Sequence, residues 1–255
     1  MRKTGEILVV GLGPGPDVWR TPEASAAIER ATDLVGYEPY LARCPERPGQ
    51  TRHGSDNRVE LERARLAIDL ARAGRIVAVV SGGDPGVFAM AAAVVEAVEA
   101  DGAAGDLEVT VLPGISAMQA AAARLGAPLG HDFCAISLSD NLKPWALVEK
   151  RLRAAAEGDF VIAFYNPASK ARPTRIFDAF ELLCGLKAGA TPVAFARAVG
   201  RPDERIVVTT LADADPSIVD MATMVIIGSS ESRLIDRPGG TPWILSPRQS
   251  RGGAA

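Results

Sequence analysis

The feature that most constrains the fold is the stretch at residues 75–88. It begins with the unbroken apolar run Ile-Val-Ala-Val-Val at 76–80, which is typical of a strand buried on both faces, as in a parallel sheet. Ser-Gly-Gly-Asp-Pro-Gly follows at 81–86. The two glycines allow a sharp turn close to a ligand, and Pro85 delays the next helix, so Asp84 stands on an open loop. Because such loops line the ligand crevice of open α/β sheets, we expect a functional role here, although a plain turn would also explain the glycines.

Strand-like apolar runs alternate with helix-like segments along the chain. In the first half the expected strands are residues 6–10, 34–35, 76–80 and 107–112. Alternation of this kind is typical of parallel sheets with right-handed crossovers. A looser second set has expected strands at 134–138, 160–164, 192–196, 206–210 and 224–227. We therefore expect an α/β protein with two α/β domains and mostly parallel sheets, at 1–115 and 116–236, and a flexible tail at 237–255 that is rich in Pro, Gly and Arg.

Charge and composition argue against several classes of protein. The chain has 255 residues and a formal net charge of -3, which disfavours general affinity for nucleic acid. No apolar segment reaches the roughly 18 residues that span a bilayer, and the first residues lack a signal-peptide core. We expect a cytoplasmic protein without membrane or nucleic-acid partners. The three cysteines and two histidines have no metal-ligand spacing, so we expect no metal site.

The first loop, Gly-Leu-Gly-Pro-Gly-Pro at 11–16, is only superficially a dinucleotide fingerprint. Position 16 is proline, and the helix starts later, at Thr21-Pro22-Glu23, so a pyrophosphate would lack the helix end that it needs. The acidic ribose-binding residue is also missing, because Asp33 precedes the second strand. The chain has no Walker lysine motif and no G-x-S-x-G elbow. A pocket lined mainly by backbone N–H and C=O groups, small side chains and one acidic side chain suits a compact neutral or cationic ligand.

Four sequence blocks in order resemble the tetrapyrrole methylases. The blocks are Gly-Leu-Gly-Pro-Gly at 11–15, Ser-Gly-Gly-Asp-Pro at 81–85, Pro-Gly-Ile-Ser-Ala at 113–117 and Thr-Pro-Val-Ala at 191–194. The resemblance covers roughly residues 5–235. Further blocks are most similar to the branch that methylates precorrin-3B; they lie at 36–41, 81–91, 132–140 and 165–172.

The resemblance implies S-adenosylmethionine as the cofactor, in a cleft between two domains. Carried over by position, the implied cofactor contacts are Pro14, Gly82, Gly83, Asp84, Val87, Ser116, Ala117, Tyr165, Ala196 and Val199. The family often has a Glu-x-Gly type segment where this chain reads Arg-Ala-Val-Gly at 197–200. We expect Asp84 to position the cofactor and not to act as a base. A plain helix start is the alternative explanation for Ser116 and Ala117.

A tetrapyrrole substrate carries many carboxylates, which call for fork-shaped cationic donors. The expected substrate-binding residues are Arg172, Arg175, Lys170 and Arg197, with Arg20 and Arg52 as further candidates, although solvated surface arginines are the alternative. Ring contraction also requires proton transfer. The expected catalytic residues are Asp140, Ser139 and Tyr165, with Lys143 and His131 as alternatives and Asp140 as the first choice.

The resemblance thus implies an S-adenosylmethionine-dependent C-methyltransferase of cobalamin biosynthesis. The resemblance implies methylation of precorrin-3B at carbon 17, ring contraction to precorrin-4 and a homodimeric enzyme. One alternative is a sibling methylase that acts on another corrin precursor. A methylase of protein or RNA is disfavoured because the chain has no basic surface run. A non-catalytic small-molecule binding module would share the cleft but would need no proton-handling side chains.

Overall fold

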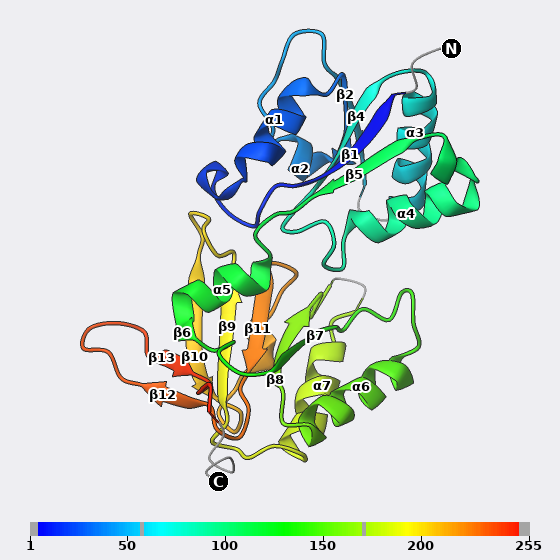
Figure 1. Cartoon of the computed structure of the whole chain (residues 1–255). Coiled ribbons are helices and arrows are strands. Elements are labelled where there is room, and N and C mark those ends of the chain that lie inside the picture. The colour runs from blue at the N-terminus through cyan, green and yellow to red at the C-terminus, as the bar shows by residue number, and fades with distance from the viewer. Residues whose placement is uncertain (1–4, 57–58, 170–171, 250–255) are drawn as a thin grey trace. The chain divides into compact units, whose positions relative to one another are not determined.

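The chain divides into two compact units, Met1–Ala117 and Met118–Ala255. The structure is a computed structural model that describes residues 5–56, 59–169 and 172–249. Each unit is built around its own five-stranded sheet (Figure 1). Among the described residues, no helix has both the length and the apolar character needed to cross a membrane.

The sheet of the first unit is entirely parallel. Its strands are β1 (Glu6–Gly11), β2 (Asp33–Tyr37), β3 (Thr51–Ser55), β4 (Ile76–Ser81) and β5 (Glu108–Leu112), in the order β3-β2-β4-β1-β5. The most apolar runs, β1 and β4, occupy central positions and pair in register from Glu6 with Ile76 to Gly11 with Ser81. Parallel pairing brings the carboxyl ends of all five strands to one edge of this sheet.

Helices cover both faces of the first sheet. The helices are α1 (Pro22–Arg30), α2 (Glu38–Leu41), α3 (Glu60–Arg72) and α4 (Met90–Ala100), with short 3₁₀ turns η1 (Asp17–Trp19) and η2 (Ala103–Gly105). Successive side chains of β1 point to opposite faces. Leu8 and Val10 therefore pack in one core layer with α1 and α2, while Ile7 and Val9 pack in a second layer with α3 and α4. Figure 1 shows these two pairs of helices on opposite faces of the sheet.

The sheet of the second unit is mixed, and here the sequence expectation was only partly right. Its strands are β7 (Phe133–Ser137), β8 (Val161–Tyr165), β9 (Pro192–Arg197), β10 (Arg205–Thr210) and β11 (Thr223–Ile227), in the order β10-β9-β11-β8-β7. The α/β class is confirmed, but only β7 and β8 pair in parallel; the other three pairings are antiparallel. "Mostly parallel" is therefore wrong for this sheet. Because β11 runs opposite to both β8 and β9, the carboxyl ends of β7, β8 and β9 share one edge.

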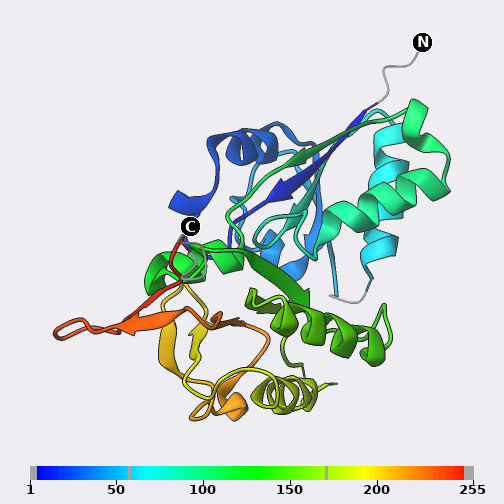
Figure 2. The same cartoon turned by 60° about the horizontal axis from the view of Figure 1, so that its bottom comes forward.

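The core of the second unit lies between its sheet and two helices. The helices of this unit are α5 (Ala117–Leu125), α6 (Trp145–Glu157), α7 (Arg175–Cys184) and the 3₁₀ turn η3 (Pro216–Ile218). Helices α6 and α7 lie side by side in both views (Figure 1, Figure 2). The ring of Phe180 on α7 stacks on Phe195 of β9, with ring centroids 5.8 Å apart. This packing fixes one face of the sheet.

A small third sheet corrects the expected tail. It has the order β12 (Arg233–Ile235), β13 (Trp243–Leu245) and β6 (Gly126–Ala127). Strand β13 lies inside the segment expected to be a flexible tail from residue 237. It pairs with both other strands, and Ile244 is buried, so the expectation is wrong for this strand.

Candidate functional site

Three of the motif loops meet at the carboxyl edge of the first sheet. They follow β1, β4 and β5, which are neighbours in the order β4-β1-β5. Gly13 and Gly83 exchange two backbone hydrogen bonds, each 3.1 Å long. Both glycines have left-handed backbone, with φ of +66° and +72°, a region that costs glycine little and other residues more. The paired glycines thus join the first two loops.

The third loop approaches the first two at backbone distance. A Cβ built on Gly114 would lie 2.4 Å from the carbonyl oxygen of Gly83 and 3.1 Å from the carbonyl carbon of Gly11. A Cβ on Gly82 would lie 2.6 Å from the ring of Tyr40, on α2. Gly82 and Gly114 are therefore required by close packing, against Tyr40 and against the neighbouring loops. This finding gives them a structural reason that is independent of any ligand.

Asp84 holds the second and third loops together. Its Oδ1 accepts the backbone N–H of Gly86 at 2.8 Å, and its Oδ2 accepts the backbone N–H of Gly114 at 3.0 Å. The side chain is half-buried. A carboxylate has about four lone-pair sites, so these two bonds leave acceptor capacity for a cationic ligand group.

The remaining expected cofactor residues of the first unit lie on the same three loops or at the start of the helix that follows the third loop. Pro14 and Val87 are half-buried, whereas Ser116 is 4% exposed and Ala117 is the first residue of α5. Phe88, which the sequence analysis did not single out, is 51% exposed and has a φ of 53°. A bulky residue with left-handed backbone is a genuine outlier, and such strain concentrates at functional sites.

In the second unit, the candidate residues after β7 and β8 share the carboxyl edge of that sheet. The phenol oxygen of Tyr165 accepts the backbone N–H of Met118, in the first turn of α5, at 3.3 Å. The side chain of Asn166 donates to the Ser137 hydroxyl at 3.0 Å, and the same oxygen accepts the backbone N–H of Ser139 at 3.3 Å. These bonds fix the ends of both strands and the loop that carries the catalytic candidates.

Asp140 is engaged in an arginine cluster. Its Oδ2 lies 2.9 Å from Nε of Arg175, and its Oδ1 lies 3.7 Å from Nε of Arg172. Arg175 also pairs with Asp178 at 3.0 Å and lies 4.6 Å above the ring of Trp145. Burial tends to raise the pKa of Asp140, but hydrogen bonds, chiefly from Arg175, together with the positive charges of Arg175 and Arg172 outweigh burial, so the pKa is lowered. An ionised, paired carboxylate is a weak base, which favours a positioning role.

Two further proton-transfer candidates lie in different places. Burial lowers the pKa of Lys143, on the loop after β7, and the positive charges of Arg151 and Arg172 lower it further. His131 precedes β7 and accepts the N–H of Asp132 on Nδ1 at 2.8 Å. His131 is therefore at the amino end of this strand, and Asp140 and Lys143 follow its carboxyl end.

The segment after β9 reaches the same edge of the second sheet. Ala196 and Val199 are buried, at 1% and 6% exposure, and Ala198 between them has a φ of 49°. Arg197 is ion-paired with Asp203 at 2.7 Å and Asp220 at 2.8 Å, and these carboxylates raise its pKa. These two carboxylates hold the Arg197 guanidinium in place, as Asp140 and Asp178 hold that of Arg175.

Two other arginine candidates bind backbone, and one substrate candidate cannot be placed. Arg20 is 5% exposed and donates to Asp17 and to the carbonyl of Arg43, and Arg52 donates to three carbonyls, those of Leu41, Cys44 and Pro45. Lys170 lies outside the described residues. Arg43, which donates to three carbonyls of the first motif loop, is not among the site residues expected from the sequence. Its position in a polar stretch without periodicity gave no signal.

The comparisons with known proteins agree on one family. A sequence model described as Tetrapyrrole (Corrin/Porphyrin) Methylases matches residues 6–215. A precorrin-3B C(17)-methyltransferase from Sinorhizobium sp is 56% identical over 246 residues, which are 96% of this chain and 97% of that protein. The crystal structure of the methyltransferase CobJ matches with a TM-score of 0.91 and 52% identity, over 95% of this chain and 100% of that chain.

A more distant structure bears on the cofactor. A uroporphyrin-III C-methyl transferase from Thermus thermophilus, solved in complex with S-adenyl homocysteine, matches with a TM-score of 0.68 and 26% identity. The match covers 88% of this chain and 97% of that chain. The match of the family model extends over most of the sequence, from β1 to the segment before η3. On this evidence, the chain belongs to the family of tetrapyrrole (corrin/porphyrin) methylases.

Proposed function

We propose that this chain is an S-adenosylmethionine-dependent methyltransferase of cobalamin biosynthesis. Its reaction would be methylation of precorrin-3B at carbon 17 with ring contraction to precorrin-4. The observation that carries this proposal is the 56% identity to the Sinorhizobium precorrin-3B C(17)-methyltransferase over 96% of this chain. The match to CobJ, with a TM-score of 0.91, supports the same function.

The residues expected to contact the cofactor fit it chemically. Of the ten residues assigned to it in the sequence analysis, Asp84 alone is charged, and its half-buried carboxylate suits an ammonium group. When bound, S-adenosylmethionine supplies a methyl group on a positively charged sulfonium. Surroundings with little charge and exposed backbone edges favour a transition state in which that charge disperses. The loops hold their own geometry through Gly13, Gly83 and Asp84, so they are preorganised for a ligand.

For the substrate, we propose that Arg172 and Arg175 bind carboxylates of the macrocycle. Asp140 holds these two guanidinium groups in place through ion pairs of 3.7 and 2.9 Å. We therefore assign Asp140 to positioning and keep Ser139 and Tyr165 as proposed catalytic residues. Lys143, with its lowered pKa, is an additional candidate for proton transfer on the same loop.

Calorimetry and product analysis test the proposal against its alternatives. The protein should bind S-adenosylhomocysteine, and incubation of precorrin-3B with S-adenosylmethionine should add one methyl group, seen by mass spectrometry. Methylation of a different corrin precursor in a matched panel, with precorrin-3B unchanged, would identify a sibling methylase. Binding without turnover of any precursor would favour a non-catalytic binding module. Including the cobalt-containing form of the substrate determines whether the enzyme prefers a metal-bearing ring.

We also propose a homodimer that acts in the cytoplasm, as the family resemblance implies. Light scattering on the purified protein should give twice the 26.7 kDa mass of the chain. A mass of one chain across the working concentration range would contradict the dimer. Fractionation of cells that produce the protein tests the compartment.

A further inference from the structure

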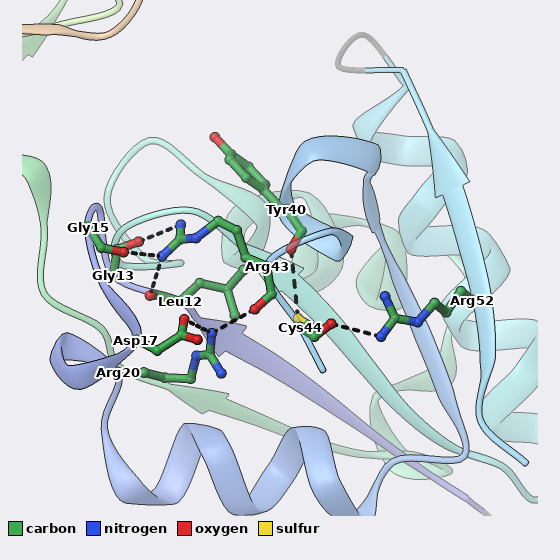
Figure 3. A network of polar contacts seen from close by, with 9 residues as sticks. All are labelled: Leu12, Gly13, Gly15, Asp17, Arg20, Tyr40, Arg43, Cys44 and Arg52. Atoms are coloured by element: carbon green, nitrogen blue, oxygen red, sulfur yellow. Dashed lines mark hydrogen bonds and ion pairs between the residues drawn. The ribbon is translucent and has the colours of Figure 1, made fainter. Parts of the chain in front are cut away.

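Arg43 donates hydrogen bonds to the loop that follows β1. It lies in the turn after α2, and Figure 3 shows its guanidinium directed at that loop. Its Nη1 donates to the carbonyl of Gly13 at 2.9 Å, and its Nη2 donates to the carbonyls of Leu12 and Gly15, both at 2.9 Å. One side chain thus fixes three carbonyl oxygens within four consecutive residues.

The same guanidinium reaches the second motif loop through a shared oxygen. The carbonyl oxygen of Gly13 accepts both Nη1 of Arg43 and the backbone N–H of Gly83, the latter at 3.1 Å. Gly13 has left-handed backbone, so its carbonyl direction depends on these two donors more than on intrinsic preference. Arg43 therefore sets the direction of the carbonyl on which the pairing of the two loops depends.

Two other arginines hold Arg43 in place (Figure 3). Arg20 donates to the carbonyl of Arg43 at 3.0 Å and to Asp17 at 2.6 Å. Arg52, from β3, donates to the carbonyls of Leu41 and Cys44, on either side of Arg43, at 3.0 and 2.9 Å. The segment that presents Arg43 is thus tied down at residues before and after it. A side chain presented by a fixed backbone loses less conformational freedom when it binds the loop.

We propose that Arg43 is a positioning residue for the methyl donor. It shapes the loop that carries Pro14 and, through Gly13, the loop that carries Gly82 and Asp84. The inference rests on the proposed function, because it takes these loops as the cofactor site. The planar guanidinium of arginine can donate to all three carbonyl oxygens at once. The ammonium group of lysine is instead a point charge on a flexible side chain. Arg43→Lys should therefore retain only part of the effect.

The test measures affinity for S-adenosylhomocysteine by calorimetry, together with thermal unfolding. Arg43→Ala should raise the Kd by about tenfold or more, since a misplaced binding loop loses preorganisation. Arg43→Lys should give an intermediate Kd, and low millimolar guanidinium should restore part of the affinity of Arg43→Ala. Steady-state kinetics should show a raised KM for the donor with a much smaller change in kcat.

Gln50→Ala is the matched control. Gln50 donates to the carbonyls of Ile28 and Ala31, both at 2.9 Å, at the C-terminal end of α1 in the same unit. The Gln50→Ala variant should have a lower unfolding temperature than the parent. Its Kd for S-adenosylhomocysteine should stay within about twofold of the parent value, as expected for a site without contact to the loops.

The outcomes separate this inference from the proposed function. If the parent protein does not bind S-adenosylhomocysteine, the proposed function itself fails. If the parent binds and a folded Arg43→Ala protein binds equally well, the role of Arg43 is refuted and the proposed function stands. If Arg43→Ala does not fold, the Arg43→Lys protein decides: an unchanged Kd refutes the inference, and a raised Kd that Gln50→Ala does not share supports it.

Discussion

Asp84 and Gly114, 30 residues apart in the sequence, are joined by a 3.0 Å hydrogen bond from the backbone N–H of Gly114 to Oδ2 of Asp84. The bond links the loop after β4 to the loop after β5, and the other carboxylate oxygen closes the turn at Gly86. The acid that the sequence motif singles out therefore organises the sheet edge before any ligand arrives. Its replacement should change both the stability of the fold and the affinity for the cofactor.

Asp84→Ala removes the acceptor for two backbone N–H groups. The free energy of unfolding should fall by about 1.5–3 kcal/mol, the range for hydrogen bonds to a charged group. The Kd for S-adenosylhomocysteine should rise by about tenfold or more if the carboxylate also meets a ligand cation. Urea denaturation and calorimetry measure the two effects.

Asp101→Ala serves as the control for Asp84. Asp101 forms a surface ion pair with Arg72, and both side chains are partly exposed. Loss of this ion pair should lower the free energy of unfolding by at most about 1 kcal/mol and leave the Kd for S-adenosylhomocysteine unchanged. A folded Asp84→Ala protein with the parent Kd would remove Asp84 from the cofactor site.

Gly114→Ala tests the close approach of the loops. The new Cβ would lie 2.4 Å from the backbone oxygen of Gly83, and a backbone atom cannot swing aside. Such overpacking should lower the free energy of unfolding by about 1–3 kcal/mol. Gly105→Ala is the matched control, because a Cβ there meets nothing within 4 Å, and its effect should stay within about 0.5 kcal/mol. Equal stability of the two variants in thermal unfolding would disprove the predicted clash.

Asp140→Asn distinguishes positioning from proton transfer. If Asp140 holds Arg172 and Arg175, the variant should raise KM for the tetrapyrrole, change kcat by less than about threefold and leave the pH profile of kcat in place. A general acid or base should instead cost about 10²–10⁴ in kcat. Steady-state kinetics between pH 6 and 9 give the answer. A large loss of kcat with unchanged KM would restore Asp140 as the catalytic residue.

Asp33 should make stability depend on acid pH. It is 2% exposed; burial alone would raise its pKa, but hydrogen bonds from Arg75, His53 and Thr32 lower it below the usual 3.8. Because the pKa of Asp33 is lower in the folded state than in the unfolded state, its ionised carboxylate stabilises the fold at every pH above the unfolded-state pKa. This stabilisation is lost as the pH falls through the folded-state pKa. Asp33→Asn should cost about 2 kcal/mol at pH 7, and the difference from the parent should shrink below pH 3.8. A constant difference in urea denaturation from pH 7 to pH 3 would contradict this assignment.

The sequence predicted the elements that carry strong local patterns and missed those that depend on partners. The apolar runs of β1 and β4 and the capped start of α1, where the Thr21 side chain accepts the N–H of Ala24 at 3.1 Å, were evident locally. Strand β3 reads Thr-Arg-His-Gly-Ser and is a strand because it pairs along β2. Strand direction in the second sheet also follows from pairing, since an apolar run has the same pattern in either direction.

The parts of the candidate site that could be predicted are the loops whose conformation glycine and proline determine. The parts that could not be predicted are side-chain contacts between residues far apart in the sequence. The loops after β1, β4 and β5 were located from their motifs. The hydrogen bond from Arg43 to the carbonyl of Gly13, 30 residues away, could not be predicted from any local sequence pattern. The pairing of Asp140 with Arg175, 35 residues away, likewise changed its interpretation from a base to a positioning group.

The proposed reaction of this chain is transfer of a methyl group to carbon 17 of precorrin-3B. The most direct measurement is an incubation of the protein with precorrin-3B and S-adenosylmethionine labelled with ¹³C in its methyl group, followed by mass and carbon NMR spectra of the product. The expected result is a ring-contracted product that carries one label, at carbon 17. Label at another carbon, or unchanged precorrin-3B in the presence of folded protein that binds the methyl donor, would contradict it.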